Sequence, residues 1–245
     1  MPHYFVAPSR ITSPFVEIIG DTSHHLISVL RIKPGEKIDL FDGEGNIFQV
    51  VVERIEKKSL RAKIIRQSAQ SRPALKIHLF CGILKGAGME LLLEKATEAG
   101  AGEITPLVTD RTIVRLKDGE SKLLRWQKKV LAACEQSARA FIPPVNPPLK
   151  FSEAIGKNIS TGFNILAWEE EDKKPLRQAI ADYRQNFSDQ KTINIFVGPE
   201  GGFTPAEAGF ARHSNYQIIT LGKTILKAET APLPLLFILQ YELTS

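Results

Sequence analysis

From residue 76 onward, short apolar runs alternate with longer segments in which apolar residues recur every three or four positions. The short runs are typical of buried strands, and the longer segments are typical of helices with one apolar face. Strands are predicted at residues 77–84, 104–108, 163–168, 192–197 and 216–221. Helices are predicted at residues 89–99, 122–139, 175–187 and 205–212, near Glu153, and in a last segment that ends at Glu242. This alternation predicts an α/β domain with a parallel sheet.

The first 72 residues follow a different pattern, in which short β-rich runs predominate. Strands are predicted at residues 37–41, 48–55 and 60–65, with a turn signal at 42–46. One short helix is predicted at 24–31, and Pro34-Gly35 follows it. The polar stretch 67–73 has no apolar periodicity and is interpreted as a linker. We therefore expect two domains, at residues 1–72 and 73–245.

Composition places the chain among ordinary globular proteins. It has 245 residues, of which 43% are hydrophobic and 24% charged, so it can build a core. Its longest apolar run, 231–239, is far shorter than the ~20 residues that span a bilayer. The N-terminus shows no basic segment followed by an apolar run, so we expect no secretory signal and a cytoplasmic protein. Cys81 and Cys134 lie far apart, so neither a metal site nor a disulfide framework is expected.

Positive charge is concentrated in one stretch. Residues 110–150 contain nine Lys or Arg against four Asp or Glu, a net charge of +5 that equals the excess of the whole chain. Local clustering of this kind favours a polyanionic partner, of which nucleic acid is the commonest. The alternative is a solvated helical face that only keeps the protein in solution.

The chemistry is expected in three loops. Ligands of parallel α/β sheets bind beyond the carboxyl ends of the strands, here after Trp168, Val197 and Leu221. The second loop, 198–203, has three glycines in five residues, which allow a backbone to approach a ligand closely, and a side chain at Gly201 would obstruct this approach. It matches neither the dinucleotide nor the phosphate-loop motif. A tight structural turn is the alternative. The segment 204–207 then predicts a helix start with a capping box.

An ordered set of motifs covers nearly the whole chain and resembles the RsmE family of ribosomal RNA methyltransferases, in the knotted SPOUT superfamily. The set comprises His25-Leu26, Val29-Leu30-Arg31, Pro34-Gly35, Leu40-Phe41-Asp42-Gly43, Lys95, Glu98, Gly100, Ile104, Pro106-Leu107, Arg111, Trp126, Ala132-Ala133, Glu135-Gln136-Ser137, Arg139, Pro143, Gly198-Pro199-Glu200-Gly201-Gly202-Phe203, Leu221-Gly222 and Ile225-Leu226-Lys227-Ala228-Glu229-Thr230-Ala231.

This resemblance implies a small PUA-like β-barrel for residues 1–72 and a SPOUT domain with a parallel sheet and a C-terminal trefoil knot for the rest. It implies a homodimer that binds S-adenosylmethionine in the knot and methylates N3 of one uridine in 16S ribosomal RNA. A base in folded RNA must be unstacked before its N3 edge is reachable, so the substrate is expected to be a structured small-subunit particle.

The candidate site residues fall into three groups. The expected cofactor-binding residues are Leu166, Ala167, Trp168, Val197, Gly198, Pro199, Glu200, Gly201, Gly202, Leu221, Gly222, Ile225, Leu226, Thr230 and Ala231. The expected RNA-binding residues are Arg10, Arg31, Arg111, Arg115, Lys122, Arg125, Lys128, Lys129 and Lys227. Uracil N3 carries a proton, so a group must remove it or stabilise the uridinate, and Glu229 and Arg139 are the candidates. For Glu229 the alternative is a carboxylate that complements a helix dipole, and for Arg139 it is a phosphate contact or a dimer salt bridge.

The chain departs from the family pattern in three respects. Lys227 replaces an arginine, which removes a planar bidentate contact but keeps the charge. Ala138 replaces a glycine, and Pro232 and Pro234 follow Ala231 at the start of the last helix, which Thr230 is expected to cap. Two further hypotheses remain. One is a related enzyme that acts on transfer RNA or a ribose oxygen, and the other is a catalytically silent RNA-binding protein.

Overall fold

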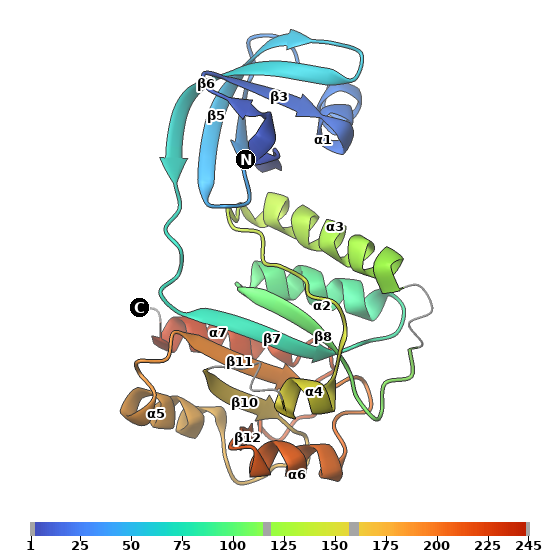
Figure 1. Cartoon of the computed structure of the whole chain (residues 1–245), viewed down its shortest axis with the longest axis vertical. Coiled ribbons are helices and arrows are strands. Elements are labelled where there is room, and N and C mark those ends of the chain that lie inside the picture. Colours follow the sequence, from blue (N-terminus) through green and yellow to red (C-terminus); the bar gives the residue numbers. More distant parts are fainter. Residues whose placement is uncertain (1–2, 115–118, 157–161, 244–245) are drawn as a thin grey trace. The chain divides into compact units, whose positions relative to one another are not determined.

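The change of pattern near residue 72 corresponds to a division of the molecule. The computed structural model describes residues 3–114, 119–156 and 162–243 (Figure 1). One unit comprises Met1–Arg72 with Leu131–Ile142, and the other comprises Pro73–Val130 with Pro143–Ser245. The segment 131–142 belongs with the first unit, although the sequence placed it in the second domain. A helical periodicity shows that one face is buried but does not show against which sheet.

The first unit contains one mostly antiparallel sheet. Its strands are β1 (His3–Phe5), β2 (Ile11–Thr12), β3 (Phe15–Ile19), β4 (Lys37–Phe41), β5 (Asn46–Ile55) and β6 (Ser59–Ala69). They lie in the order β1-β4-β5-β6-β3-β2, and only β1 and β4 are parallel. The described ladders therefore give a sheet with two ends where the resemblance implies a barrel. Val16, Leu26, Leu40, Val50 and Leu60 are fully buried in its core.

Two expectations for this unit were wrong in detail. The stretch 67–73 is not all linker, because β6 continues to Ala69 and pairs with β5 through its backbone, which needs no apolar side chains. The predicted helix 24–31 is instead a short helix α1 (Gly20–His24) followed by a π-helical turn, His25–Val29. Strands β1, β2 and β3 were not predicted, because each is short and lies at or near an end of the sheet.

The second unit is built on a fully parallel sheet, as predicted. Its strands are β7 (Lys76–Gly82), β8 (Glu103–Val108), β9 (Leu149–Lys150), β10 (Phe163–Ala167), β11 (Thr192–Val197) and β12 (Gln217–Ile219). Their order is β12-β10-β11-β7-β8-β9. The helices are α2 (Ala87–Glu98), α4 (Phe151–Gly156), α5 (Leu176–Asn186), α6 (Pro205–His213) and α7 (Pro232–Leu243). Helix α3 (Gly119–Ser137) belongs to this unit up to Val130 and to the first unit from Leu131. Among the strands described for this unit, only β9, which is two residues long, was not predicted.

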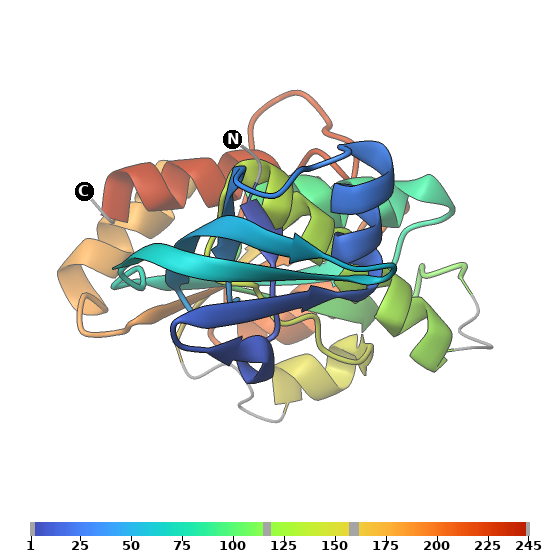
Figure 2. The ribbon, with the colours of Figure 1, turned by 90° about the horizontal axis from the view of Figure 1, so that it is seen from above.

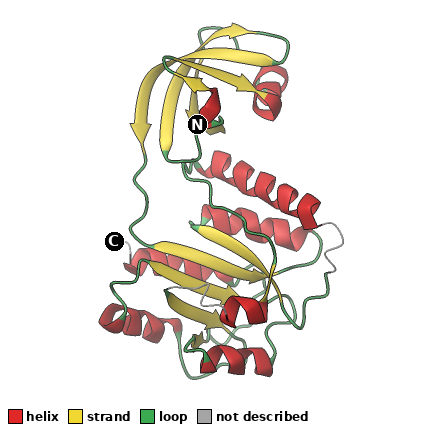
Figure 3. Ribbon diagram, viewed as in Figure 1, coloured by secondary structure: helices red, strands yellow, loops and turns green. Residues whose placement is uncertain are grey.

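Helices cover both faces of this sheet (Figures 2 and 3). Phe80, Phe196, Leu166 and Ile218 occupy one row across four neighbouring strands and pack with the side chains of α4 and α6. The rings of Phe80 and Phe196 stack with centroids 4.3 Å apart. On the other face, α2 and α7 pack against each other. This two-layer cover leaves the carboxyl ends of the central strands for the loops that follow them.

Ala138 adopts a backbone conformation that favours glycine. It follows the last residue of α3 with a φ of 56°, and the next amide, that of Arg139, donates to the Cys134 carbonyl at 3.1 Å. The left-handed region costs a residue with a Cβ roughly 1–2 kcal/mol. An alanine in place of glycine at position 138 is therefore expected to lower the stability of the fold.

We expect Ala138→Gly to raise the free energy of unfolding by about 1 kcal/mol, because the relief of strain exceeds the added entropy of the unfolded chain. Urea denaturation measures the change. Ala132→Gly, in the interior of α3, is the matched control and should lower stability by about 0.5–1 kcal/mol. Equal destabilisation by both substitutions would contradict this interpretation of Ala138.

A group of polar side chains lies at the amino ends of β7 and β8. His78 Nε2 is 2.8 Å from Thr105 Oγ1 and 3.7 Å from Glu103 Oε1. Asn146 Nδ2 donates to Glu103 at 2.6 Å and to Thr105 at 2.8 Å. Burial, together with the nearby charge of Lys76 and against the opposing effect of Glu103, lowers the pKa of His78 from 6.5 to about 4. His78 is therefore neutral in the folded protein at pH 7.

Acid is expected to destabilise the fold through His78. Between pH 6.5 and pH 4 the unfolded chain binds a proton that the folded chain does not, so the free energy of unfolding falls with falling pH, by up to about 3 kcal/mol at pH 4. His78→Gln should make the stability curve flatter over this interval. Urea titrations of both proteins at pH 7, 5.5 and 4.5 test this, and parallel curves would exclude His78 as the cause.

Candidate functional site

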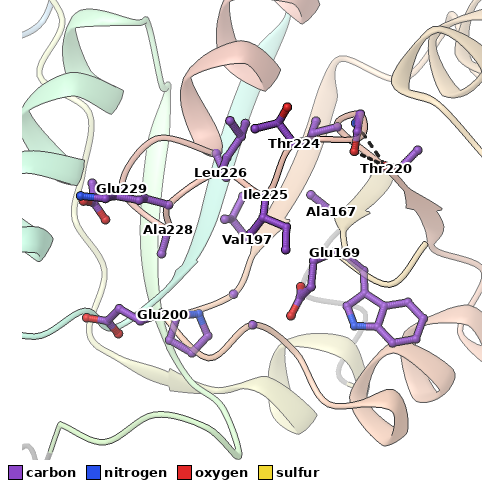
Figure 4. Close-up of a pocket in the computed structure, with 18 of the residues that line it drawn as sticks. Ala167, Glu169, Val197, Glu200, Thr220, Thr224, Ile225, Leu226, Ala228 and Glu229 are labelled. Atoms are coloured by element: carbon purple, nitrogen blue, oxygen red, sulfur yellow. Dashed lines mark hydrogen bonds between the residues drawn. The ribbon is translucent and has the colours of Figure 1, made fainter. Parts of the chain in front are cut away.

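The three loops that follow β10, β11 and β12 meet around one cavity of about 630 Å³ in the second unit (Figure 4). This volume is typical of small-molecule sites. The cavity is lined by Lys85, Gly88, Ala167, Trp168, Glu169, Val197, Gly198, Pro199, Glu200, Gly202, Thr220, Leu221, Gly222, Lys223, Thr224, Ile225, Leu226, Lys227, Ala228, Glu229 and Ala231.

Two positions of the glycine-rich loop disfavour a side chain, Gly198 through close backbone and Gly202 through its left-handed φ. A Cβ on Gly198 would lie 2.8 Å from the backbone carbon of Gly202. A Cβ on Gly202, whose φ is 67°, would lie 1.7 Å from the Glu169 carboxylate. The Gly202 amide donates to the Pro199 carbonyl at 2.8 Å and closes the turn. Bare backbone is therefore presented to the cavity.

The helix after this loop begins as predicted. Thr204 is the N-cap of α6, its hydroxyl accepts from the Glu207 amide at 3.2 Å, and the Glu207 carboxylate accepts from the Thr204 amide at 2.8 Å. The other oxygen of Glu207 accepts from the Asp110 amide at 3.0 Å. The capping box thus also holds the loop that follows β8.

The last loop turns twice before α7. Gly222 has a φ of 118°, and its amide donates to the Thr220 hydroxyl at 3.1 Å. The amides of Thr230 and Ala231 both donate to the Lys227 carbonyl at 2.9 Å. Helix α7 begins at Pro232, and the Thr230 carbonyl accepts from the Leu233 amide at 3.0 Å, while the capping role of the Thr230 side chain stays a prediction. Both prolines lie in the first turn, where amides have no intrahelical partner, so they are compatible with the helix.

Carboxylates lie on two sides of the cavity (Figure 4). Glu200 and Glu229 lie on one side and Glu169 on the other. The Glu200 carboxylate accepts from the backbone amide of Lys85 at 2.8 Å, so it has a structural partner. Glu229 and Lys227 both line the cavity, and both belong to the segment that precedes α7. An acid and a cation are therefore available at this end of the cavity.

Most of the expected cofactor residues line this cavity, and three do not. Leu166 is fully buried in the core beside α4 and α6. A Cβ on Gly201 would meet the Arg111 side chain at 3.2 Å rather than enter the cavity, and Thr230 is not among the lining residues. Sequence reasoning missed Lys85 and Gly88. They follow β7, so the same rule about carboxyl ends of strands would have found them.

The expected RNA-binding residues are dispersed. Lys227 lines the cavity, whereas Arg111 contacts the glycine-rich loop. In the second unit, Arg125 and Lys129 of α3 pair with Glu90 and Glu94 of α2, the latter at 2.7 Å. These two pairs reduce the free positive charge that the sequence suggested.

Other predicted residues lie outside this arrangement. In the first unit, Arg10 pairs with Glu17 at 2.8 Å, and Arg31 is exposed with a φ of 53°. The catalytic candidate Arg139 is also in the first unit, where burial lowers the pKa of its guanidinium. Lys122 and Lys128 are on α3, and Arg115 lies outside the described residues.

Within the described part of the chain, no three His, Cys, Asp or Glu side chains gather into a group that could hold a metal ion. The helices described there are all too short or too polar to cross a membrane.

Comparison with known proteins gives the family. Residues 70–240 match the model of an RNA methyltransferase domain, and residues 18–65 match that of an RNA methyltransferase PUA domain. The ribosomal RNA small subunit methyltransferase E of Synechocystis is 33% identical over 93% of this chain and 73% of its own length. That of Bacillus subtilis is 27% identical over 99% of this chain and 97% of its own.

Solved structures agree. The ribosomal RNA small subunit methyltransferase E of Neisseria gonorrhoeae, bound to S-adenosylmethionine, is 32% identical with a TM-score of 0.85, over 98% of this chain and 97% of that one. A Legionella pneumophila protein described as a methyltransferase, also with that cofactor, is 27% identical with a TM-score of 0.85, over 98% and 96%. The chain therefore belongs to the ribosomal RNA small subunit methyltransferase E family.

Proposed function

We propose that this protein transfers a methyl group from S-adenosylmethionine to N3 of a uridine in the 16S RNA of the small ribosomal subunit. The observation that carries the proposal is the cavity at the carboxyl ends of β10, β11 and β12, in a chain whose relatives were crystallised with this cofactor. The uridine N3 position comes from the family resemblance of the motifs.

The cavity fits a nucleoside cofactor. Gly198 and Gly202 line the cavity with backbone alone, and the segment 221–226 adds more backbone and the apolar Ile225 and Leu226. Backbone amides and carbonyls can hydrogen-bond an adenine edge and ribose hydroxyls. When bound, S-adenosylmethionine supplies an activated methyl on a positively charged sulfur. The protein's task is then to hold the acceptor base in line, and alignment alone can contribute about 7–11 kcal/mol.

The acceptor nitrogen must lose a proton. Glu229 is our candidate for accepting it, and Lys227 for stabilising the negative charge that develops on the base. The chemistry is not directed to carbon 5 by a cysteine nucleophile, because Cys81 and Cys134 are not among the lining residues of the cavity. Arg139, the other residue that the sequence offered for stabilising the uridinate, stays a prediction, with a phosphate contact or a dimer salt bridge as its alternative.

The C-terminal trefoil knot is part of the proposal. The strand β12 pairs only with β10 at the edge of the sheet, whereas α7 packs against α2 and β11 nearer its centre. The chain must therefore return past the ends of β10 and β11 through the segment 220–231, which lines the same cavity as the loops it passes. If the segment that leads to α7 passes through the loops after β10 and β11, the chain forms a trefoil knot, which is rare among protein folds.

We also propose a homodimer, because α7 carries exposed apolar side chains. Phe237 is 58% exposed, Ile238 42% and Tyr241 78%, and Leu91 of the neighbouring α2 is 44% exposed. Apolar surface of this extent is typical of an interaction site. Light scattering at micromolar concentration should give twice the 27.2 kDa monomer mass. Phe237→Glu should give the monomer mass, and a monomeric parent protein would contradict the proposal.

The substrate is proposed to be an assembled small subunit in the cytoplasm, since tertiary RNA structure presents the unpaired base. Methyl transfer from a labelled donor should be fastest with small subunits, slower with free 16S RNA and absent with transfer RNA. Calorimetry with S-adenosylmethionine distinguishes the enzyme from a silent RNA-binding protein. Well-folded protein without heat of binding would favour the latter, and label in transfer RNA would overturn the substrate.

A further inference from the structure

We propose that Arg111 is a positioning residue, which holds the glycine-rich loop in its cofactor-binding shape, and that it is not a contact to RNA phosphate. The inference rests on the proposed function, because it concerns the same cavity. Arg111 itself is not among the lining residues, so it acts through the residues that it contacts.

The guanidinium of Arg111 bridges two carbonyls of the loop. Its Nη1 donates to the Gly201 carbonyl at 2.6 Å and lies 3.3 Å from the Phe203 carbonyl. These carbonyls flank Gly202, which has the left-handed φ of 67°. The Phe203 carbonyl also accepts from Trp168 Nε1 at 3.2 Å, and Trp168 lines the cavity. The guanidinium thus holds the carbonyls on both sides of Gly202, the residue of the loop with a left-handed backbone.

The same nitrogen is linked to a carboxylate of the cavity wall. Arg111 Nη1 lies 3.9 Å from Glu169 Oε1, and Glu169 occupies the space that a Cβ on Gly202 would need. Arg111 Nη1 is the cation that lies near all three oxygens, those of Glu169, Gly201 and Phe203. Without the guanidinium, the Glu169 carboxylate would lie near the two carbonyls with no positive charge to balance it. Repulsion between these oxygens would favour a different loop conformation.

The backbone that carries Arg111 is fixed to the same structure. The Asp110 amide donates to Glu207 at 3.0 Å, and the Thr109 amide donates to the Thr112 hydroxyl at 2.9 Å. Glu207 belongs to the capping box of α6, which directly follows the glycine-rich loop. The same glutamate therefore holds the start of that helix and the backbone next to Arg111. The arginine therefore starts from a fixed position.

Arginine and lysine differ in this role. Both loop contacts of Arg111 come from Nη1, at the far end of the side chain, whereas a lysine side chain is one bond shorter and holds its ammonium nearer the backbone. Arg111→Lys keeps the charge that would bind a phosphate but loses the bridge between the two carbonyls. This substitution therefore separates a positioning role from an RNA contact.

The experiment compares the parent protein, Arg111→Lys and a matched control, Arg212→Lys, whose arginine pairs with Glu171 away from the loop at 2.9 Å. Calorimetry should show at least a tenfold loss of S-adenosylmethionine affinity in Arg111→Lys and none in the control. RNA affinity without cofactor, and its dependence on salt, should be unchanged in both. Unchanged cofactor affinity in Arg111→Lys would overturn the inference.

A second measurement needs no cofactor. Amide hydrogen exchange in Arg111→Lys should be faster in peptides covering 198–204 and unchanged in peptides covering α2 and β7. Unchanged exchange at 198–204 would overturn the inference. If the parent protein binds no S-adenosylmethionine, the proposed function fails, and the exchange result still decides the role of Arg111.

Discussion

Replacing Gly198 by alanine is expected to lower the affinity for S-adenosylmethionine at least 100-fold. The new Cβ would lie 2.8 Å from the backbone carbon of Gly202 and 3.0 Å from the Phe203 nitrogen. Backbone cannot move aside as a flexible side chain can, so the loop must open and the cavity wall must change. The fold should persist with a loss of about 1–3 kcal/mol in the free energy of unfolding, as for other overpacked sites.

The control for this substitution is Gly209→Ala in α6. A Cβ there meets nothing within 4 Å, and alanine favours a helix, so stability should rise by up to about 1 kcal/mol with cofactor affinity unchanged. Calorimetry measures both affinities, and circular dichroism checks the fold. Parent-like affinity in Gly198→Ala would show that the loop does not form the cofactor site.

Glu229→Gln is expected to lower the rate of methyl transfer 10²- to 10⁴-fold, the usual contribution of a general base, with cofactor affinity retained. Glutamine keeps the shape of the side chain but cannot accept the N3 proton. Single-turnover transfer to small subunits, at saturating cofactor, measures the step directly. Raising the pH should partly restore the rate of the variant, because free solution base then deprotonates the uracil.

Glu170→Gln is the control, since Glu170 is an exposed carboxylate that is not among the lining residues of the cavity. It should transfer methyl groups at the parent rate. A change of less than threefold in Glu229→Gln would leave Glu229 as a helix-start carboxylate, which is the alternative that the sequence left open.

The sheet of the second unit could be predicted because its strands are buried on both faces and therefore read as continuous apolar runs. The observed bounds of β7, β8, β10 and β11 lie within two residues of the predicted ones. The short strands β1 and β2 have no such signal, since they are stabilised by pairing at the ends of a sheet. The position of 131–142 depended on tertiary contacts, which periodicity does not encode.

The site was predictable to the level of loops and less so to the level of residues. The rule that ligands bind beyond the carboxyl ends of strands pointed to three loops that line one cavity in the structure. It could not show that Leu166 faces the core, because neighbouring strand residues alternate between faces. Nor could it show that Arg111 contacts loop carbonyls, because an arginine in a basic segment looks the same whether it faces phosphate or protein.

Nucleoside mass spectrometry identifies the atom and the RNA that receive the methyl group. Small subunits that lack the modification are incubated with the protein and a donor carrying an isotopically labelled methyl group, and their RNA is digested to nucleosides. We expect label in N3-methyluridine from 16S RNA with the parent protein, and none with Gly198→Ala. Label on a ribose oxygen or on uracil carbon 5, or no label in 16S RNA, would contradict it.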